Sequence, residues 1–228
     1  MKRFYKAVTL EKEPGGYGIF LDGKPVKTPL RKILLLPYEG LAAKVAAEWD
    51  AQKETINIHD MRITQLAYTY ADKAEDEKDG IIAELLPYIE TELICYPVPH
   101  PADLQKKQQK LWQPLMQEFT AKTGITLKTV TEITGAANGA DEMAAFEAVL
   151  RQEDGITLTA VQAAVPLLGS AVLGYALAKK WITPAAAHEA ALVEELHQAE
   201  NWGDDEEAAK KRAELLVNLE AVTAFTAV

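Results

Sequence analysis

Glu194 and His197 form the pattern in this sequence that is most typical of a metal site. A Glu-x-x-His pair on a helix supplies half of a di-iron carboxylate centre, and the other half requires a second such pair. None of the other histidines, at 59, 100 and 188, has a glutamate three residues before it. We therefore expect Glu194 and His197 to lie on a solvated helix face and to bind no metal.

Nucleotide chemistry would require a glycine loop between a strand and a helix, where backbone N–H groups can surround a phosphate. The glycine-rich stretch 15–18 leads into a strand-like run instead, and no Walker-type lysine follows a glycine loop. Lys and Arg number 24 against 34 Asp and Glu, which gives a net charge of −10. Such an acidic chain lacks the basic face of a sequence-independent nucleic-acid binder. We expect no catalytic residues, no cofactor and no nucleic-acid partner.

A stripe of Glu194, Gln198 and Trp202 recurs at steps of four, which places the three residues on one side of a predicted helix. Two interpretations of the stripe remain open. In the first, which we call the buttress interpretation, the stripe packs against the rest of the protein and supports the fold. The spacing alone favours it, because Trp is more often in the core. In the second, the stripe is a recognition face. An exposed Trp beside carboxyl and amide groups has the composition of an interface anchor.

The elements that position these residues begin with a small antiparallel sheet. Alternating apolar and polar residues on either side of the Pro-Gly-Gly turn at 14–16 predict a hairpin, and Asp22-Gly23 supplies a second tight turn. From Leu41 the period changes to helical, with Leu41, Val45 and Trp49 on one face, and we expect Trp49 to pack this helix on the sheet. The strand-like runs are 4–12, 17–21, 24–28 and 33–36.

The rest of the chain is predicted to be helical, which makes the protein α+β. A charge-dense run at 72–79 separates a β-rich N-terminal domain, 1–78, from a larger all-helical domain, 79–228. Gly203 stands where the helix that carries the stripe ends. The helical patterns cover 61–72, 80–88, 104–120, 155–178 and 184–202, and an extended segment at 126–133 with a loop at 135–139 interrupts them.

Cysteine content and hydropathy bear on the compartment. The single Cys95 cannot form an intrachain disulfide, which favours a reducing cytoplasm. No secretory signal is visible at the N-terminus. The uncharged stretch 155–178 is interrupted by Thr, Pro and Gly, so it is typical of a buried helix and not of a membrane span. We expect a cytoplasmic monomer without membrane insertion.

Eight sequence fragments occur in a fixed order over nearly the whole chain. They are RFYK at 3–6, LDGKPVKTP at 21–29, LA…AAEWDAQ at 41–52, MRITQLA at 61–67, TELICY at 91–96, LWQPL at 111–115, LGSAVLGYAL at 168–177 and EELHQAENWG at 194–203. In these fragments the chain resembles the ATP-twelve chaperone family, whose members are assembly factors for the F(1) head of ATP synthase. The sequence departs from that family at Arg62, Gln65 and Pro97, where the family usually has Pro, Arg and Arg.

The resemblance implies the same two-part fold and a function without catalysis. Members of the family hold the unassembled α subunit of the ATPase until β subunits replace them, which prevents its aggregation. Glu194 coincides with the acidic position of the family's Glu…Gln…Trp-Gly motif, so the resemblance implies that Glu194, Gln198 and Trp202 bind the partner. Trp49 and Gly203 are expected to be structural, from their places at the sheet contact and at the helix end. Without a transit sequence, the chain is expected to be a bacterial member, whereas eukaryotic relatives work in the mitochondrial matrix.

The alternative is a small-molecule-binding protein or an enzyme with a cleft between the two domains. Polar residues near the end of the first helix could line such a cleft. The competing interpretation is that they form only a solvated helix end and loop. The residues concerned are Glu48, Asp50, Gln52, Asp60 and Arg62.

Overall fold

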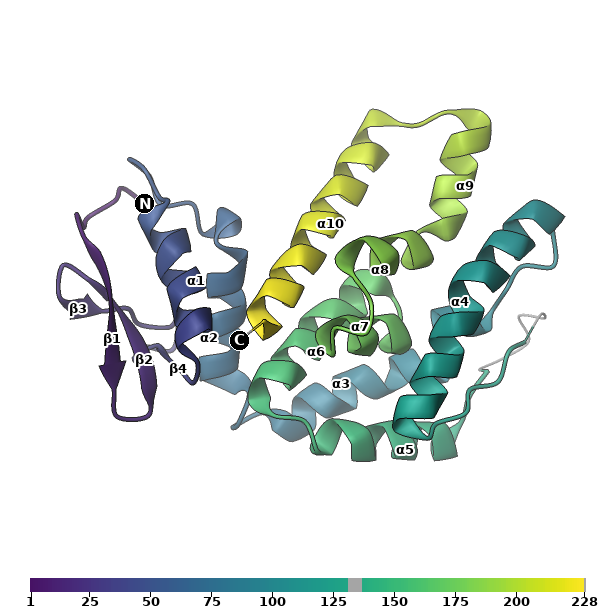
Figure 1. Cartoon of the computed structure of the whole chain (residues 1–228), viewed down its shortest axis with the longest axis horizontal. Helices are drawn as coiled ribbons and strands as arrows, with labels where there is room; N and C mark the ends of the chain where they lie inside the picture. Colours follow the sequence, from purple (N-terminus) through teal and green to yellow (C-terminus); the bar gives the residue numbers. More distant parts are fainter. Residues whose placement is uncertain (131–136, 228) are drawn as a thin grey trace.

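The computed structural model describes residues 1–130 and 137–227 of the chain. Figure 1 shows a small sheet at one end of the long axis and a body of helices that extends away from it. This α+β architecture is the one expected from the sequence. None of the helices in the described ranges combines the length and the apolar character that crossing a bilayer requires.

The sheet is antiparallel and is built around its second strand. β1 pairs with β2 through the predicted hairpin, with Leu10 opposite Ile19, and β2 also pairs with β3 and with β4. Gly15 and Gly16 in the turn have φ of 100° and 151°, which explains why glycine occupies both positions. The strands are β1 Val8–Glu13, β2 Gly16–Leu21, β3 Lys24–Pro25 and β4 Leu35–Leu36.

The helices follow the sheet and fill the rest of the chain. Two short 3-10 turns, η1 Ile58–Asp60 and η2 Leu93–Cys95, lie among the earlier ones. The helices are α1 Glu39–Asp50, α2 Arg62–Lys73, α3 Lys78–Glu90, α4 Ala102–Thr123, α5 Ala140–Arg151, α6 Gly155–Leu168, α7 Ala171–Ala178, α8 Pro184–Ala191, α9 Val193–Trp202 and α10 Glu206–Thr226.

Helix α1 packs on β1, β2 and β4 through one apolar face. Leu41 and Val45 are completely buried, and Trp49 is 6% exposed. The Trp49 ring meets the Tyr5 ring edge-on, with 5.8 Å between their centroids, and the Tyr5 hydroxyl donates to the Trp49 carbonyl at 2.6 Å. Trp49 therefore joins the N-terminal segment, the sheet and α1.

Helix α2 connects the two parts of the chain. It contacts α1 on one side and α6 and α10 on the other. The buried Asp72 carboxylate accepts hydrogen bonds from the Thr28 hydroxyl at 2.6 Å and from the Leu30 N–H at 3.2 Å, which ties α2 to the loop after β3. We propose the boundary between domains 1–78 and 79–228 after this helix.

Two long helices expected from the sequence are each divided in two. The stretch 155–178 forms α6 and α7, because Gly169 adopts φ 63° and the Ser170 side chain caps α7. The two helices then fold back so closely that a Cβ on Gly174 would lie 2.5 Å from Val165 Cγ2. The expectation of a single helix here was wrong, because the stretch forms two. The expected burial is seen throughout α7, where every residue is buried.

The stretch 184–202 is also divided, into α8 and α9 at Leu192. The Trp112 indole N–H donates to the Ala190 carbonyl at 2.8 Å. In a continuous helix that carbonyl would accept from the N–H of Glu194. The Trp112 side chain of α4 therefore occupies the carbonyl that a continuous helix would use for its next backbone hydrogen bond.

The expected extended segment at 126–133 is not a strand over residues 126–130, and the remainder lies outside the described residues. Leu127 is buried, and the Lys128 N–H donates to the Asn138 side chain at 3.0 Å, so this segment is fixed by contacts other than a sheet. Of the expected loop at 135–139, residues 137–139 are irregular and the first two are outside the described ranges.

Glu92 places a completely buried carboxyl group at the N-terminus of α7. It accepts hydrogen bonds from the Ser170 hydroxyl, from the Val172 N–H at 3.0 Å and from the Ile94 N–H at 3.4 Å. Burial nevertheless raises the pKa of Glu92 to about 7, because removal from water penalises the charged form more than these donors favour it.

We expect Trp49→Arg to destabilise the fold by about 3 kcal/mol or more, because it places a charge in the contact between α1 and the sheet. Thermal unfolding followed by circular dichroism measures the loss. An unchanged melting temperature would contradict the described packing of Trp49.

Glu92 should also make stability depend on pH. Its folded pKa of about 7 lies above the ordinary value of 4.5, so the folded state retains a proton that the unfolded state releases between these values. The stabilisation that the neutral Glu92 carboxyl group contributes is therefore fully present below about pH 4.5, and it is lost as the pH rises through 7. Relative to Glu92→Gln, the wild-type free energy of unfolding should fall by about 3 kcal/mol between pH 4.5 and 8. Denaturant titrations on both proteins measure this, and parallel pH profiles would refute it.

Candidate partner-binding site

Helix α9 is a short segment held between two changes of chain direction. It begins after the break at Leu192 and ends at Gly203, which adopts φ 93° and ψ 158°. The chain then turns through Asp204 and Asp205 into α10, as Figure 1 shows at the top of the view. This arrangement confirms the expected helix end at Gly203, and it leaves α9 in contact with α4 and α8.

Glu194, in the first turn of α9, points toward α4. One of its carboxylate oxygens accepts from Gln108 Nε2 at 2.8 Å, and Gln108 itself is completely buried. The other side of the Gln108 amide accepts from the Val98 N–H at 2.8 Å. The half-buried Glu194 is therefore held in a defined position through α4.

His197 does not join Glu194 in a metal site. The expectation of a solvated helix face is wrong for His197, because its ring is only 5% exposed. Its Nε2 lies 3.6 Å from an Asp103 carboxylate oxygen. Among the residues that the structure describes, no three His, Cys, Asp or Glu side chains are grouped as metal ligands would be.

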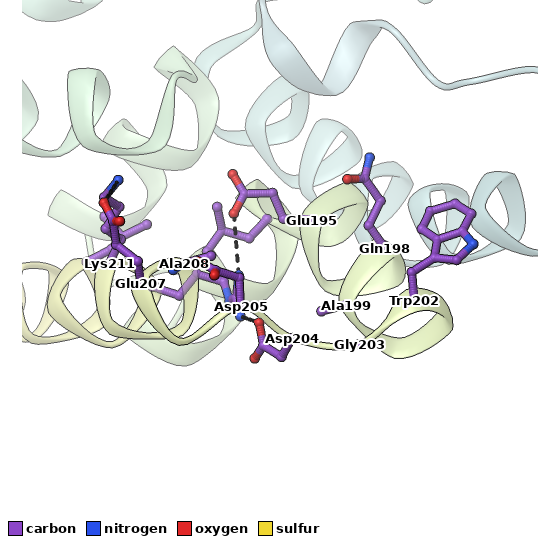
Figure 2. Close-up of a pocket in the computed structure, with 13 residues that line it drawn as sticks. Glu195, Gln198, Ala199, Trp202, Gly203, Asp204, Asp205, Glu207, Ala208 and Lys211 are labelled. Carbon is purple, nitrogen blue, oxygen red and sulfur yellow. Dashed lines mark hydrogen bonds and ion pairs between the residues drawn. The ribbon is translucent and has the colours of Figure 1, made fainter.

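Trp202 is 79% exposed, so the buttress interpretation is wrong for this residue. Gln198 is exposed as well, and Figure 2 shows the two side chains projecting from the same side of α9. They line an open groove of about 720 Å³ between α9 and α10. The remaining lining residues are Leu192, Glu195, Ala199, Gly203, Asp204, Asp205, Glu207, Ala208, Lys211, Arg212 and Leu215.

The charges around this groove are mostly paired. Arg212, nearly buried, forms ion pairs with Asp204 and, at 3.8 Å, with Glu195. The hydrogen bond from Asp204 raises the pKa of Arg212 above its ordinary value. Lys211 pairs with Glu207 at 2.7 Å. With both cations engaged, the groove presents an acidic edge and the exposed Trp202 ring.

The three residues of the stripe are therefore not together on one surface. Gln198 and Trp202 line the groove, whereas Glu194 is not among its lining residues and bonds to α4. Each step of four residues turns a helix by about 40° beyond a full turn, so two steps separate the ends of the stripe by about 80°. Sequence reasoning missed Gln108 and Arg212. No sequence spacing relates Gln108 to Glu194, because the two lie on different helices.

The residues considered for a cleft between domains have structural roles. Glu48 accepts from the N–H groups of Ile63 at 2.9 Å and Thr64 at 2.7 Å, which caps α2. Gln52 and Asp60 both bond to Asn57, and Asp50 pairs with Arg3. Arg62 lines a hollow of about 500 Å³ between α2, α6 and α10 and donates to Asn218 at 2.6 Å. These five residues do not converge on one cleft. Most of them belong to the helix end and loop, as the competing interpretation expected.

The structure defines an α+β protein in which a small sheet packs on helices and an exposed tryptophan lies beside an open groove. Comparisons with known proteins identify its family. The family model described as ATP12 chaperone protein matches residues 2–120. The protein atp12, mitochondrial, of Schizosaccharomyces pombe is 26% identical over 219 residues, which cover 91% of this chain and 75% of that protein.

Two solved structures have the same fold over almost the whole chain. Atp12 from Paracoccus denitrificans is 31% identical, with a TM-score of 0.91 and coverage of 99% of this chain and 97% of that one. A proposed chaperone from Agrobacterium tumefaciens is 33% identical, with a TM-score of 0.92 and coverage of 99% and 85%. The chain belongs to the ATP12 chaperone family. It is an assembly chaperone for ATP synthase and not an enzyme.

We expect Trp202→Ala to change the free energy of unfolding by less than about 0.5 kcal/mol, because the side chain is almost fully in water. Trp112→Ala should lower the free energy of unfolding by about 3 kcal/mol or more, since Trp112 is buried and its indole N–H donates to Ala190 beside the break between α8 and α9. Urea titrations of both variants give the comparison. A marked loss of stability in Trp202→Ala would restore the buttress interpretation.

Proposed function

We propose that this chaperone binds the unassembled α subunit of the F(1) head and prevents its aggregation until the β subunit replaces it. The observation that supports this most directly is Trp202, a large aromatic side chain left 79% exposed at the edge of a groove. Exposed aromatic residues beside polar groups are typical anchors of protein interfaces.

The physical basis is the apolar surface that a subunit exposes before its neighbours arrive. A binder that covers this surface lowers the concentration of the free, aggregating species by mass action. Release requires no ATP hydrolysis. If the β subunit overlaps the footprint of the chaperone and buries more surface, exchange follows from the difference in affinity.

In this proposal Glu194, Gln198 and Trp202 contact the client from adjoining sides of α9. Glu194 uses one oxygen to accept from Gln108, which fixes the carboxylate while leaving its negative charge half-exposed. Gln198 and Trp202 supply an amide and an aromatic ring from the groove.

The proposed setting is the bacterial cytoplasm, with the chaperone acting as a monomer. Cys95, the single cysteine, is buried and unpaired, which suits a reducing compartment. Burial raises the pKa of its thiol to about 12, so it is a poor nucleophile. The net charge of −10 disfavours association between copies.

Glu194→Gln tests the role of the charge, because glutamine retains an oxygen that can accept from Gln108. We expect the melting temperature to change little, while protection of purified α subunit against aggregation falls about tenfold at a fixed chaperone concentration. Trp202→Ala should cause a loss at least as large. Glu84→Gln, on the exposed side of α3, is the matched control and should protect normally.

Full protection by a normally folded Glu194→Gln would remove Glu194 from the site and leave Trp202 as the candidate anchor. If Trp202→Ala also protected fully, α9 would not be the client-binding surface. A wild-type protein that protected β but not α would contradict the proposed client.

A further inference from the structure

Another exposed hollow lies at the opposite end of the molecule from α9, beside the sheet. It has a volume of about 910 Å³. Its walls come from the N-terminal segment, the end of β2, β3, the loops between β3 and β4 and between α1 and η1, and from α1, η1 and α2. The lining residues are Met1, Phe4, Leu21, Lys24, Pro25, Val26, Lys27, Ile33, Trp49, Ile56, Ile58 and Tyr68.

This surface is unusually apolar for one that faces water. Of the nine large hydrophobic side chains exposed in the described part of the chain, four line this hollow. Phe4 is 63% exposed, Ile33 50% and Ile58 37%. Exposed apolar residues gathered around one depression indicate an interaction site, whereas scattered ones need no explanation.

The charge around the hollow is positive, in contrast to the rest of the chain. Lys24 and Lys27 line it, no acidic side chain does among the described lining residues, and neither lysine forms an ion pair with another described residue. Residues 1–32 contain eight Lys or Arg and three Asp or Glu, while the remaining residues contain sixteen and thirty-one. The apolar hollow therefore lies in a basic region of an acidic protein.

We propose that the hollow docks an acidic segment of a partner protein, with a large apolar side chain of that segment in the hollow and its carboxylates on Lys24 and Lys27. Two separated lysines at the edge match several carboxylates along a peptide better than the single head group of a fatty acid. An acyl chain would also remain largely in water against walls as exposed as Phe4 and Ile33, whereas a protein surface would cover them. This second surface goes beyond the proposed function, which concerns α9.

Trp49 provides a specific reporter for the site. It lines the hollow, and its indole N–H is buried with no hydrogen-bond acceptor in the structure. Trp112 donates its indole N–H to Ala190, and Trp202 lies on α9. The indole N–H signals of these tryptophans in a proton–nitrogen NMR spectrum therefore distinguish the hollow from the rest of the molecule, with Trp49→Phe to assign the signal.

The experiment titrates the full chain with the blocked peptide Asp-Glu-Leu-Phe-Glu-Asp and with its charge-reversed counterpart Lys-Arg-Leu-Phe-Arg-Lys. We expect the acidic peptide to shift the Trp49 signal and leave Trp202 unchanged, and the basic peptide to bind at least about tenfold more weakly. The double variant Lys24→Glu/Lys27→Glu should weaken acidic-peptide binding about tenfold. Lys6→Glu/Lys12→Glu, with the same change in net charge, should weaken it less than about twofold.

Apolar anchoring is tested by Phe4→Ser and Ile33→Ser against Leu30→Ser, an equally exposed residue outside the hollow. The first two should each lower affinity for the acidic peptide about tenfold and the control should not.

Equal binding of both peptides, equal effects of both lysine pairs, or a Trp49 response to decanoate but not to the acidic peptide would overturn the proposal. So would a dimer in sedimentation that Lys24→Glu/Lys27→Glu abolishes, because a second copy would then occupy the hollow. None of these outcomes affects client protection through α9, so the two proposals fail independently.

Discussion

The buried carboxyl group of Glu92 at the N-terminus of α7 is the contact on which the arrangement of the helical body depends. It joins η2, just after α3, to the turn between α6 and α7, which are about 80 residues further along the chain. Helix α7 is buried over its entire length and touches α3, α4, α6, α8 and α10. These neighbours surround α7, and the absence of a side chain at Gly174 allows its close approach to Val165 of α6.

The orientation of α9 follows from α4, which packs against α7. Trp112 takes the Ala190 carbonyl and ends α8, Gln108 holds Glu194, and Lys107 pairs with Glu200 near the far end of α9. Three side chains from one helix thus determine both where α9 begins and which of its sides faces the protein. The opposite side, with Gln198 and Trp202, is left toward the groove and solvent.

Local signals in the sequence were sufficient for the sheet and for most helix boundaries. The Pro-Gly-Gly turn with its flanking alternation predicts the β1–β2 hairpin, Thr183 caps α8 through the Ala186 N–H, and Gly124 ends α4 with φ 77°. Each of these features is determined within a few residues, so a sequence pattern can express it.

Features that depend on distant partners could not be predicted in this way. The break at Leu192 results from Trp112, 78 residues before Ala190, and the run around it is as helical in composition as its neighbours. Glu92 looks like any surface carboxylate in the sequence, and only the folded chain brings Ser170 and the α7 N-terminus to it. The stripe on α9 was recognisable as a pattern, but which of its residues are exposed depends on how α4 packs against α9.

The uneven distribution of charge between the sheet and the helices also affects how the chaperone meets a partner. Positive residues concentrated in 1–32 and negative ones in the remainder give the molecule a permanent electric dipole along its long axis. In the field of another charged protein such a molecule rotates into a preferred orientation before any contact forms, which raises the fraction of productive collisions. Because ions screen this torque beyond about 8 Å at physiological ionic strength, the speed of capture is sensitive to salt even where the final affinity is not. For the proposed protection of a client against aggregation, the rate of encounter matters as much as the strength of the complex.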